Sequence, residues 1–171
     1  MNLELLAVGR VGVDLYPEQA GPLKDVTSFA KFLGGTATNV AVGAARLGRR
    51  TAVLTKVGPD GFGDFVREAL AGFMVDNSYV GTAEGLLTPV VFCELNPPED
   101  PPLLFYRQPM APDLTLTSAD VPWDVVRDVP VFWITGTGVS VEPSRNPHLE
   151  MLRHRGRPDA GSGRLTILDL D

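Results

Sequence analysis

The sequence of 171 residues predicts an α/β protein of three layers, in which helices cover both faces of a mostly parallel sheet. Short apolar runs that end at glycine alternate along the chain with stretches of helical periodicity. Parallel strands joined by crossover helices require this alternation. Two consecutive strand-like runs interrupt it around a proline-rich connection. We therefore expect one α/β unit with a small β-hairpin standing off its main body.

The first elements follow the α/β pattern. Residues 3–8 form an apolar run that stops at Gly9, which predicts a buried strand. Residues 38–47 are small or apolar and precede Gly48, the residue type favoured just past a helix end. Residues 51–57 are rich in strand-forming residues and stop at a Gly-Pro pair, so we expect a second strand there.

The middle of the chain holds the interruption. Residues 62–73 carry apolar side chains at helical spacing, and residues 77–80 predict a short strand. Strand-like runs follow at residues 86–95 and 103–106, separated by the segment NPPEDPP at 96–102. Four prolines in these seven residues exclude a helix and predict a stiff, solvated connection. This combination is typical of a hairpin with a long tip.

The last third returns to alternating elements. Residues 118–126 and 147–154 predict helices, residues 131–135 and 165–170 predict strands, and residues 156–163 predict a loop. A βαβ protein that stops on a strand leaves part of its sheet unpaired and uncovered. We therefore expect the chain to be truncated on its C-terminal side.

Composition narrows the function classes. The net charge is −6 and the basic residues are scattered, whereas nucleic-acid binders carry a basic stripe. The longest apolar runs fall far short of the roughly 20 residues that a membrane helix needs. The single cysteine, Cys93, cannot form an internal disulfide, which fits a reducing compartment. We expect a cytoplasmic protein that binds neither nucleic acid nor membrane.

Common catalytic motifs are absent from the sequence. Neither the dinucleotide fingerprint nor the Walker phosphate loop occurs at its required spacing. His148 and His154 share one predicted helix and Cys93 stands alone, so we expect no metal site and no thiol nucleophile. The nucleophile elbow of the α/β hydrolases is missing as well.

A glycine-rich segment before the first predicted helix is the best candidate for binding. Gly34 and Gly35 leave backbone N–H groups uncovered near the positive end of a helix that Thr38 is placed to cap. Asn39 offers a donor and an acceptor to a polyol. Taken alone, two adjacent glycines also fit a tight turn with close helix packing.

The surrounding sequence extends this segment into a longer pattern. Residues 34–58, GGTATNVAVGAARLGRRTAVLTKVG, resemble the first signature of the ribokinase-like (PfkB) carbohydrate kinase family. GPDGFG at residues 58–63 is similar to the element that follows in the family, and VGRVGVDLYP at 8–17 to its start. The resemblance spans essentially the whole chain. It implies a ribokinase-like kinase domain over 1–171 with a hairpin lid at about 80–110.

The resemblance also implies roles for four residues in the first part of the chain. Asp14 matches the aspartate that binds sugar hydroxyls, and an ionised carboxylate can accept two of their hydrogen bonds. Gly34 and Gly35 match the diglycine hinge on which the lid moves, and Asn39 matches the substrate-binding asparagine. Without the resemblance, Asp14 would equally fit a turn.

Within the family, residues 105–117 and 133–145 most resemble the kinases of sugar acids. Arg107 matches the arginine that these enzymes aim at the substrate, and its guanidinium group fits a carboxylate. Tyr106 is a candidate beside it. By itself, Arg107 would also fit a surface residue whose aliphatic stem covers apolar neighbours.

The resemblance implies an ATP-dependent kinase that uses ATP and Mg²⁺ and allows a monovalent cation as a further cofactor. It also implies a homodimer formed through the lid. The family's catalytic aspartate lies in its C-terminal half, whereas this sequence resembles the N-terminal half, so no catalytic residue and no activity are expected in this chain alone. Two alternatives stay open. One is a kinase of another sugar, such as 2-keto-3-deoxygluconate, ribose or fructose, and the other is a non-catalytic sugar-binding module.

Overall fold

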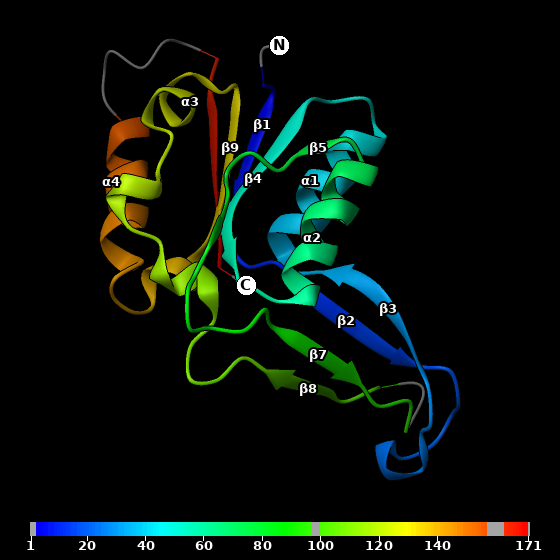
Figure 1. The fold of residues 1–171 in the computed structure, drawn as a ribbon. Helices are drawn as coiled ribbons and strands as arrows, with labels where there is room; N and C mark the ends of the chain where they lie inside the picture. The colour runs from blue at the N-terminus through cyan, green and yellow to red at the C-terminus, as the bar shows by residue number, and fades with distance from the viewer. Residues whose placement is uncertain (1–2, 97–99, 157–162, 171) are drawn as a thin grey trace.

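A computed structural model describes residues 3–96, 100–156 and 163–170. Its main sheet has, among these residues, six parallel strands in the order β10-β9-β1-β4-β5, with β6 also paired to β4 (Figure 1). The strands are β1 (Leu5–Val8), β4 (Thr51–Val57), β5 (Val75–Asp76), β6 (Val80–Thr82), β9 (Val131–Thr135) and β10 (Leu165–Asp169).

Helices cover both faces of this main sheet (Figure 1). One face carries the helices α1 (Thr36–Arg46) and α2 (Gly61–Gly72), and the other carries α3 (Trp123–Asp128) and α4 (Arg145–Arg155). The side chains of β1 show why the strand is apolar throughout. Ala7 packs into the core beneath α1 and α2, whereas Leu6 and Val8 pack into the core beneath α3 and α4. The three-layer fold predicted from the sequence is confirmed.

A second sheet stands beyond the carboxyl ends of the main strands (Figure 1). It contains β2 (Gly12–Pro17), β3 (Phe29–Gly34), β7 (Val90–Cys93) and β8 (Leu103–Tyr106), in the order β3-β2-β7-β8. The hairpin partners β7 and β8 run antiparallel, as do β2 and β3, whereas β2 and β7 run parallel. Strands β2 and β3 were not predicted, so this sheet is larger than a single hairpin.

Two of the crossings between the two sheets, at residues 9–12 and 34–36, pack on each other. Gly35 has φ +101°, and a Cβ at this position would collide with the carbonyl oxygen of Arg10. Only glycine combines this backbone angle with so close an approach. The second glycine of the pair is therefore required by the crossing itself.

Most predicted elements are found with shifted ends, and two differ in kind. The helix predicted at residues 118–126 is a short 3-10 turn, η3 (Ser118–Asp120), followed by α3, because Pro122 disfavours helical backbone in the residue before it. The strand predicted at 77–80 begins only at Val80, the first residue of β6, and residues 77–79 form a turn after β5 in which Asp76 accepts a hydrogen bond from the Ser78 amide. Three further 3-10 turns are η1 (Leu23–Asp25), η2 (Pro112–Thr115) and η4 (Gly136–Val139).

Two expectations fall partly outside the described residues. These are the interior of the proline-rich connection, at 97–99, and most of the loop predicted at 156–163.

Candidate substrate site

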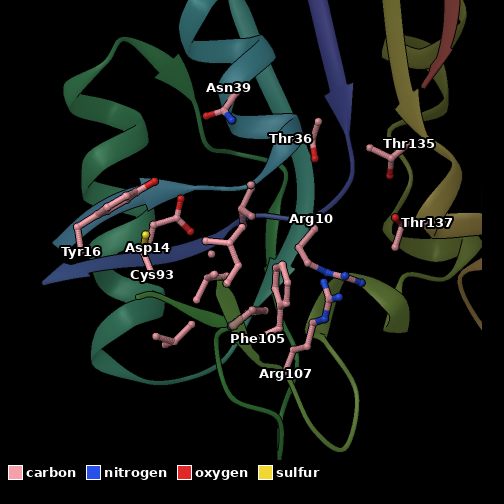
Figure 2. Close-up of a pocket in the computed structure, with 17 residues that line it drawn as sticks. Arg10, Asp14, Tyr16, Thr36, Asn39, Cys93, Phe105, Arg107, Thr135 and Thr137 are labelled. Carbon is pink, nitrogen blue, oxygen red and sulfur yellow. The ribbon is translucent and has the colours of Figure 1, made fainter. Parts of the chain in front are cut away.

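A cavity of about 490 Å³ lies where the second sheet faces the carboxyl ends of β1 and β9 (Figure 2). In open α/β sheets, ligands bind at this end of the strands. Four parts of the chain line the cavity: β2 with the connection that leads into it from β1, the start of α1, the hairpin of β7 and β8, and the end of β9. Of the residues that the sequence predicts for the site, the cavity is lined by Asp14, Gly35, Asn39 and Arg107.

Asp14 supplies a carboxylate to the cavity from β2. No protein group in the described ranges donates a hydrogen bond to it, and burial raises the pKa of the carboxyl group above its ordinary value. Gly34 pairs with Gly12 in the β2–β3 ladder, two residues along β2 from Asp14, and a Cβ at Gly34 would overlap the Asp14 carboxylate. Gly34 does not line the cavity itself, but its missing side chain leaves the space that the carboxylate occupies.

The start of α1 brings an amide side chain and open backbone donors to the cavity. Asn39 points into it from the first turn of the helix (Figure 2). Gly35 occupies the N-cap position and makes no side-chain cap, so the first N–H groups of α1 have no capping oxygen. The expected cap at Thr38 is wrong, because the helix begins two residues earlier and Thr38 is buried inside it.

Strand alternation separates the two residues predicted at the hairpin exit. Phe105 and Arg107 line the cavity, whereas Tyr106 points to the opposite face of the second sheet and packs edge-on against Phe92 at 5.2 Å between ring centroids. The structure therefore does not bring Tyr106 to this cavity. The Arg107 guanidinium lies 4.4 Å from the centre of the Phe105 ring, which holds its planar group against the cavity wall.

Arg10 also lines the cavity, and the sequence pattern did not single it out. Its Nε and Nη2 atoms donate to the two carboxylate oxygens of Asp113 at 2.9 and 3.1 Å. Burial lowers the pKa of Arg107, and the positive charge of Arg10 lowers it further against the opposing effect of Asp113. The sequence did hold one signal for Arg10: it comes two residues after β1, and residues that follow parallel strands meet at one edge of the sheet.

Two threonines at the end of β9 complete the wall beside Arg10 (Figure 2). Thr135 is buried and its hydroxyl finds no partner in the described part of the chain. A Cβ at Gly9 would lie 2.9 Å from this hydroxyl, so Gly9 lets β1 and the start of the crossing approach β9 closely. Thr137 follows in η4.

The segment GPDGFG serves the fold rather than the cavity. One carboxylate oxygen of Asp60 accepts hydrogen bonds from the amides of Phe62 and Gly63 at 3.0 and 2.9 Å, which caps α2. The other oxygen accepts from the amide of Thr88 at 2.8 Å. Asp60 thereby ties the start of α2 to the segment that leads into β7.

Residues 3–96, 100–156 and 163–170 contain no group of three or more histidine, cysteine, aspartate or glutamate side chains that could hold a metal ion. None of their helices is long and apolar enough to cross a membrane.

The fold and the cavity together define an α/β protein that can bind a small polar molecule between its main sheet and a second, smaller sheet. The chain belongs to the pfkB family of carbohydrate kinases, whose family model matches residues 2–159. The family resemblance found in the sequence is thereby confirmed.

Individual relatives agree with the family. The chain is 37% identical over 171 residues to a 5-dehydro-2-deoxygluconokinase from Clostridium tetani, covering 99% of this chain and 49% of the relative. It is 35% identical over 177 residues to the enzyme of that name from Photobacterium profundum, with coverage of 99% and 50%. The chain thus spans about half the length of the curated relatives it matches.

Solved structures share the fold. An uncharacterized sugar kinase from Pyrococcus horikoshii, also solved in complex with ATP, superposes with a TM-score of 0.82 at 29% identity, over 98% of this chain and 52% of that one. A 2-dehydro-3-deoxygluconokinase from Thermotoga maritima superposes with a TM-score of 0.84 over 99% and 51%, and at 18% identity it supports the fold alone.

Proposed function

We propose that this chain is the sugar-binding part of an ATP-dependent sugar-acid kinase, 5-dehydro-2-deoxygluconokinase, which acts in inositol catabolism in the cytoplasm. The observation that carries the proposal is the distribution of charge in one cavity. Asp14 and Asn39 lie toward one side and the guanidinium groups of Arg10 and Arg107 toward the other (Figure 2). A sugar acid has the matching polarity, with hydroxyl groups along its chain and a carboxylate at one end.

The residues of this chain would bind and orient the substrate. An ionised Asp14 accepts hydrogen bonds from hydroxyl groups, and the Asn39 amide donates and accepts them. Arg107 pairs with the carboxylate in the planar geometry that guanidinium groups favour. Together these contacts would hold the hydroxyl at the far end of the sugar acid toward the phosphate donor, ATP.

The second sheet would act as the lid of this site. Gly34 and Gly35 lie where the chain returns from the second sheet to the main sheet, so they are the natural hinge. Closure would exclude water, and the phosphoryl group would then pass to the sugar rather than to solvent. The exposed side chains of β8, Tyr106 among them, would be available for a homodimer formed through this sheet.

The remaining components would come from elsewhere in the enzyme. The residues described here form no cluster that fits Mg²⁺, so the metal ion is proposed to arrive with ATP and not to be held by them. The general base and any monovalent-cation site are likewise assigned to the part of the relatives that this chain does not cover. We expect no ATP-dependent phosphorylation of 5-dehydro-2-deoxygluconate by the purified chain; clear product formation would contradict this assignment.

Titration calorimetry of the purified chain tests the substrate class. We expect 5-dehydro-2-deoxygluconate to bind more tightly than ribose or fructose, and Arg107→Ala to remove that preference. Arg49→Ala is the matched control, because Arg49 is an exposed arginine that pairs with Glu4. Equal binding of neutral sugars would favour another kinase of the family, and tighter binding of 2-keto-3-deoxygluconate would change the assigned sugar acid. A full-length protein that binds the sugar but never phosphorylates it would favour a non-catalytic module.

A further inference from the structure

Asp113 is a buried carboxylate that the proposed function leaves unexplained. It lies in η2, on the segment that returns from β8 to the main body, and its side chain is only 5% exposed. A buried carboxylate is costly unless it is paired and hydrogen-bonded. In the described part of the chain its side-chain hydrogen bonds come from Arg10 alone, 103 residues away in sequence.

The pairing geometry leaves part of the Arg10 guanidinium group unused. A guanidinium group has five N–H donors in a planar fork. Asp113 engages the edge made by Nε and Nη2, so both N–H groups on Nη1 and one on Nη2 are left over. No acceptor among the described residues binds Nη1 of Arg10, although the residue lines the cavity. Because Asp113 fixes the plane of the group, these free donors point in a set direction.

The balance of charge at this side of the cavity also calls for an anion. Arg10 and Arg107 bring their guanidinium groups toward one another (Figure 2), and the positive charge of Arg10 acts on Arg107. Asp113 is the carboxylate that balances these two positive charges: it is bonded to Arg10, and its negative charge also acts on Arg107. Arg107 makes no hydrogen bond to any acceptor in the described residues, and its contact is the Phe105 ring. One negative charge is therefore missing between two groups whose donors are already oriented.

We propose that Arg10 is a second specificity-determining arginine, which binds the substrate carboxylate together with Arg107, and that Asp113 is the positioning residue that orients it. This inference rests on the proposed sugar-acid substrate. The carboxylate would accept from the free Nη1 edge of Arg10 on one side and from Arg107 on the other. A neutral sugar would leave both guanidinium groups without an acceptor in a partly desolvated site, so the pair would discriminate against it.

The test compares the acid with a ligand that differs only in charge. Calorimetry would measure the dissociation constants of 5-dehydro-2-deoxygluconate and of its methyl ester, which keeps the hydroxyl groups. For Arg10→Gln we expect the affinity for the acid to fall about 10- to 100-fold and that for the ester to stay within about twofold. Arg49→Gln, far from the cavity, should change neither.

Two more variants keep the test valid if Arg10→Gln folds poorly. Arg10→Lys still gives Asp113 a cation but lacks the second edge, so it should fold and lose much of the preference for the acid. Asp113→Asn should reduce the ratio of acid to ester affinity by about 3- to 10-fold, and Asp113→Glu should restore part of it. A merely structural Asp113 would weaken binding of both ligands alike and leave the ratio unchanged.

The outcomes separate the two proposals. If the unmodified chain binds acid and ester equally, the proposed function fails and this inference fails with it. If Arg107→Ala abolishes the preference for the acid but Arg10→Gln and Arg10→Lys preserve it, the proposed function stands and the inference is overturned.

Discussion

The main sheet and the second sheet of this protein differ in how their strands are buried. In β1 the side chains of Leu6, Ala7 and Val8 are completely buried between the two helical layers. In β8 every residue from Leu103 to Tyr106 is exposed, by 40% or more. The main sheet therefore holds most of the apolar area that stabilises the fold. In the second sheet, β8 contributes Phe105 to the cavity from a strand with no buried side chain, which is typical of parts that move.

Removing a large side chain from the main sheet should give the greatest loss of stability. Phe132 in β9 is fully buried beneath α3 and α4. We expect Phe132→Ala to lower the free energy of unfolding by about 3–5 kcal/mol, because a cavity is left in a closely packed core. Leu104→Ala in β8 should cost less than about 1 kcal/mol, since much of that side chain is already in water. Urea denaturation measures both, and similar losses would contradict the contrast.

A buried arginine fixes the edge of the main sheet. Arg155 in α4 donates to the carbonyl oxygens of Val126 and Val129 at 3.2 and 2.7 Å, and to that of Leu165 in β10 at 2.9 Å. Arg155→Met should cost about 2–4 kcal/mol, because it leaves buried carbonyl groups without donors. Arg153→Met, on the exposed side of the same helix, is the control. Hydrogen exchange should show faster opening of β10, and unchanged exchange there would refute this role.

In the second sheet the larger effect should be on binding. Gly34→Ala forces the Asp14 carboxylate to move, so we expect sugar affinity to fall about 10- to 100-fold, the loss expected when hydrogen bonds to a charged group are broken. Gly43→Ala in α1 meets no neighbouring atom and should stabilise the protein by about 0.5–1 kcal/mol without changing affinity. Calorimetry and thermal unfolding of the two variants provide the comparison. Normal affinity in a folded Gly34→Ala protein would exclude this role for Gly34.

The smallest expected effect is a pH dependence of the free energy of unfolding, caused by a histidine in the helical layer of α3 and α4. His148 in α4 is buried, with Nδ1 2.7 Å from the Ser144 carbonyl oxygen, and burial lowers its pKa below the ordinary 6.5. The unfolded state therefore binds the proton of this histidine more readily than the folded state. The contribution of neutral His148 to the free energy of unfolding is fully present above pH 6.5 and is lost as the pH falls toward the lower pKa of the folded state.

The free energy of unfolding should change by at most about 1.4 kcal/mol per pH unit, and His148→Asn should reduce this change. His154→Asn is the control, because that histidine is only partly buried. Unfolding free energies between pH 7.5 and 5.5 provide the measurement. The same slope with and without His148 would assign the effect to other groups.

The predictions from sequence were best where burial is regular along the chain. Strands β4 and β9 match their predicted ranges, because their apolar residues face core on both sides. Strands β2 and β3 escaped prediction. In β2, Gly12, Asp14 and Tyr16 face the cavity, so the alternation that marks a half-buried strand is mixed with functional residues.

The sequence by itself determined the α/β pattern, the glycine-rich start of α1 and the family, since these depend on local periodicity and on a contiguous signature. Only the tertiary structure decided which charged groups meet. Arg10 and Asp113 are 103 residues apart, and the burial of one creates the need for the other without leaving any local pattern. The tertiary structure also decided which residue at the hairpin exit reaches the cavity. Arg107 lines it and Tyr106 does not, because adjacent residues near the end of a strand face opposite sides of the sheet.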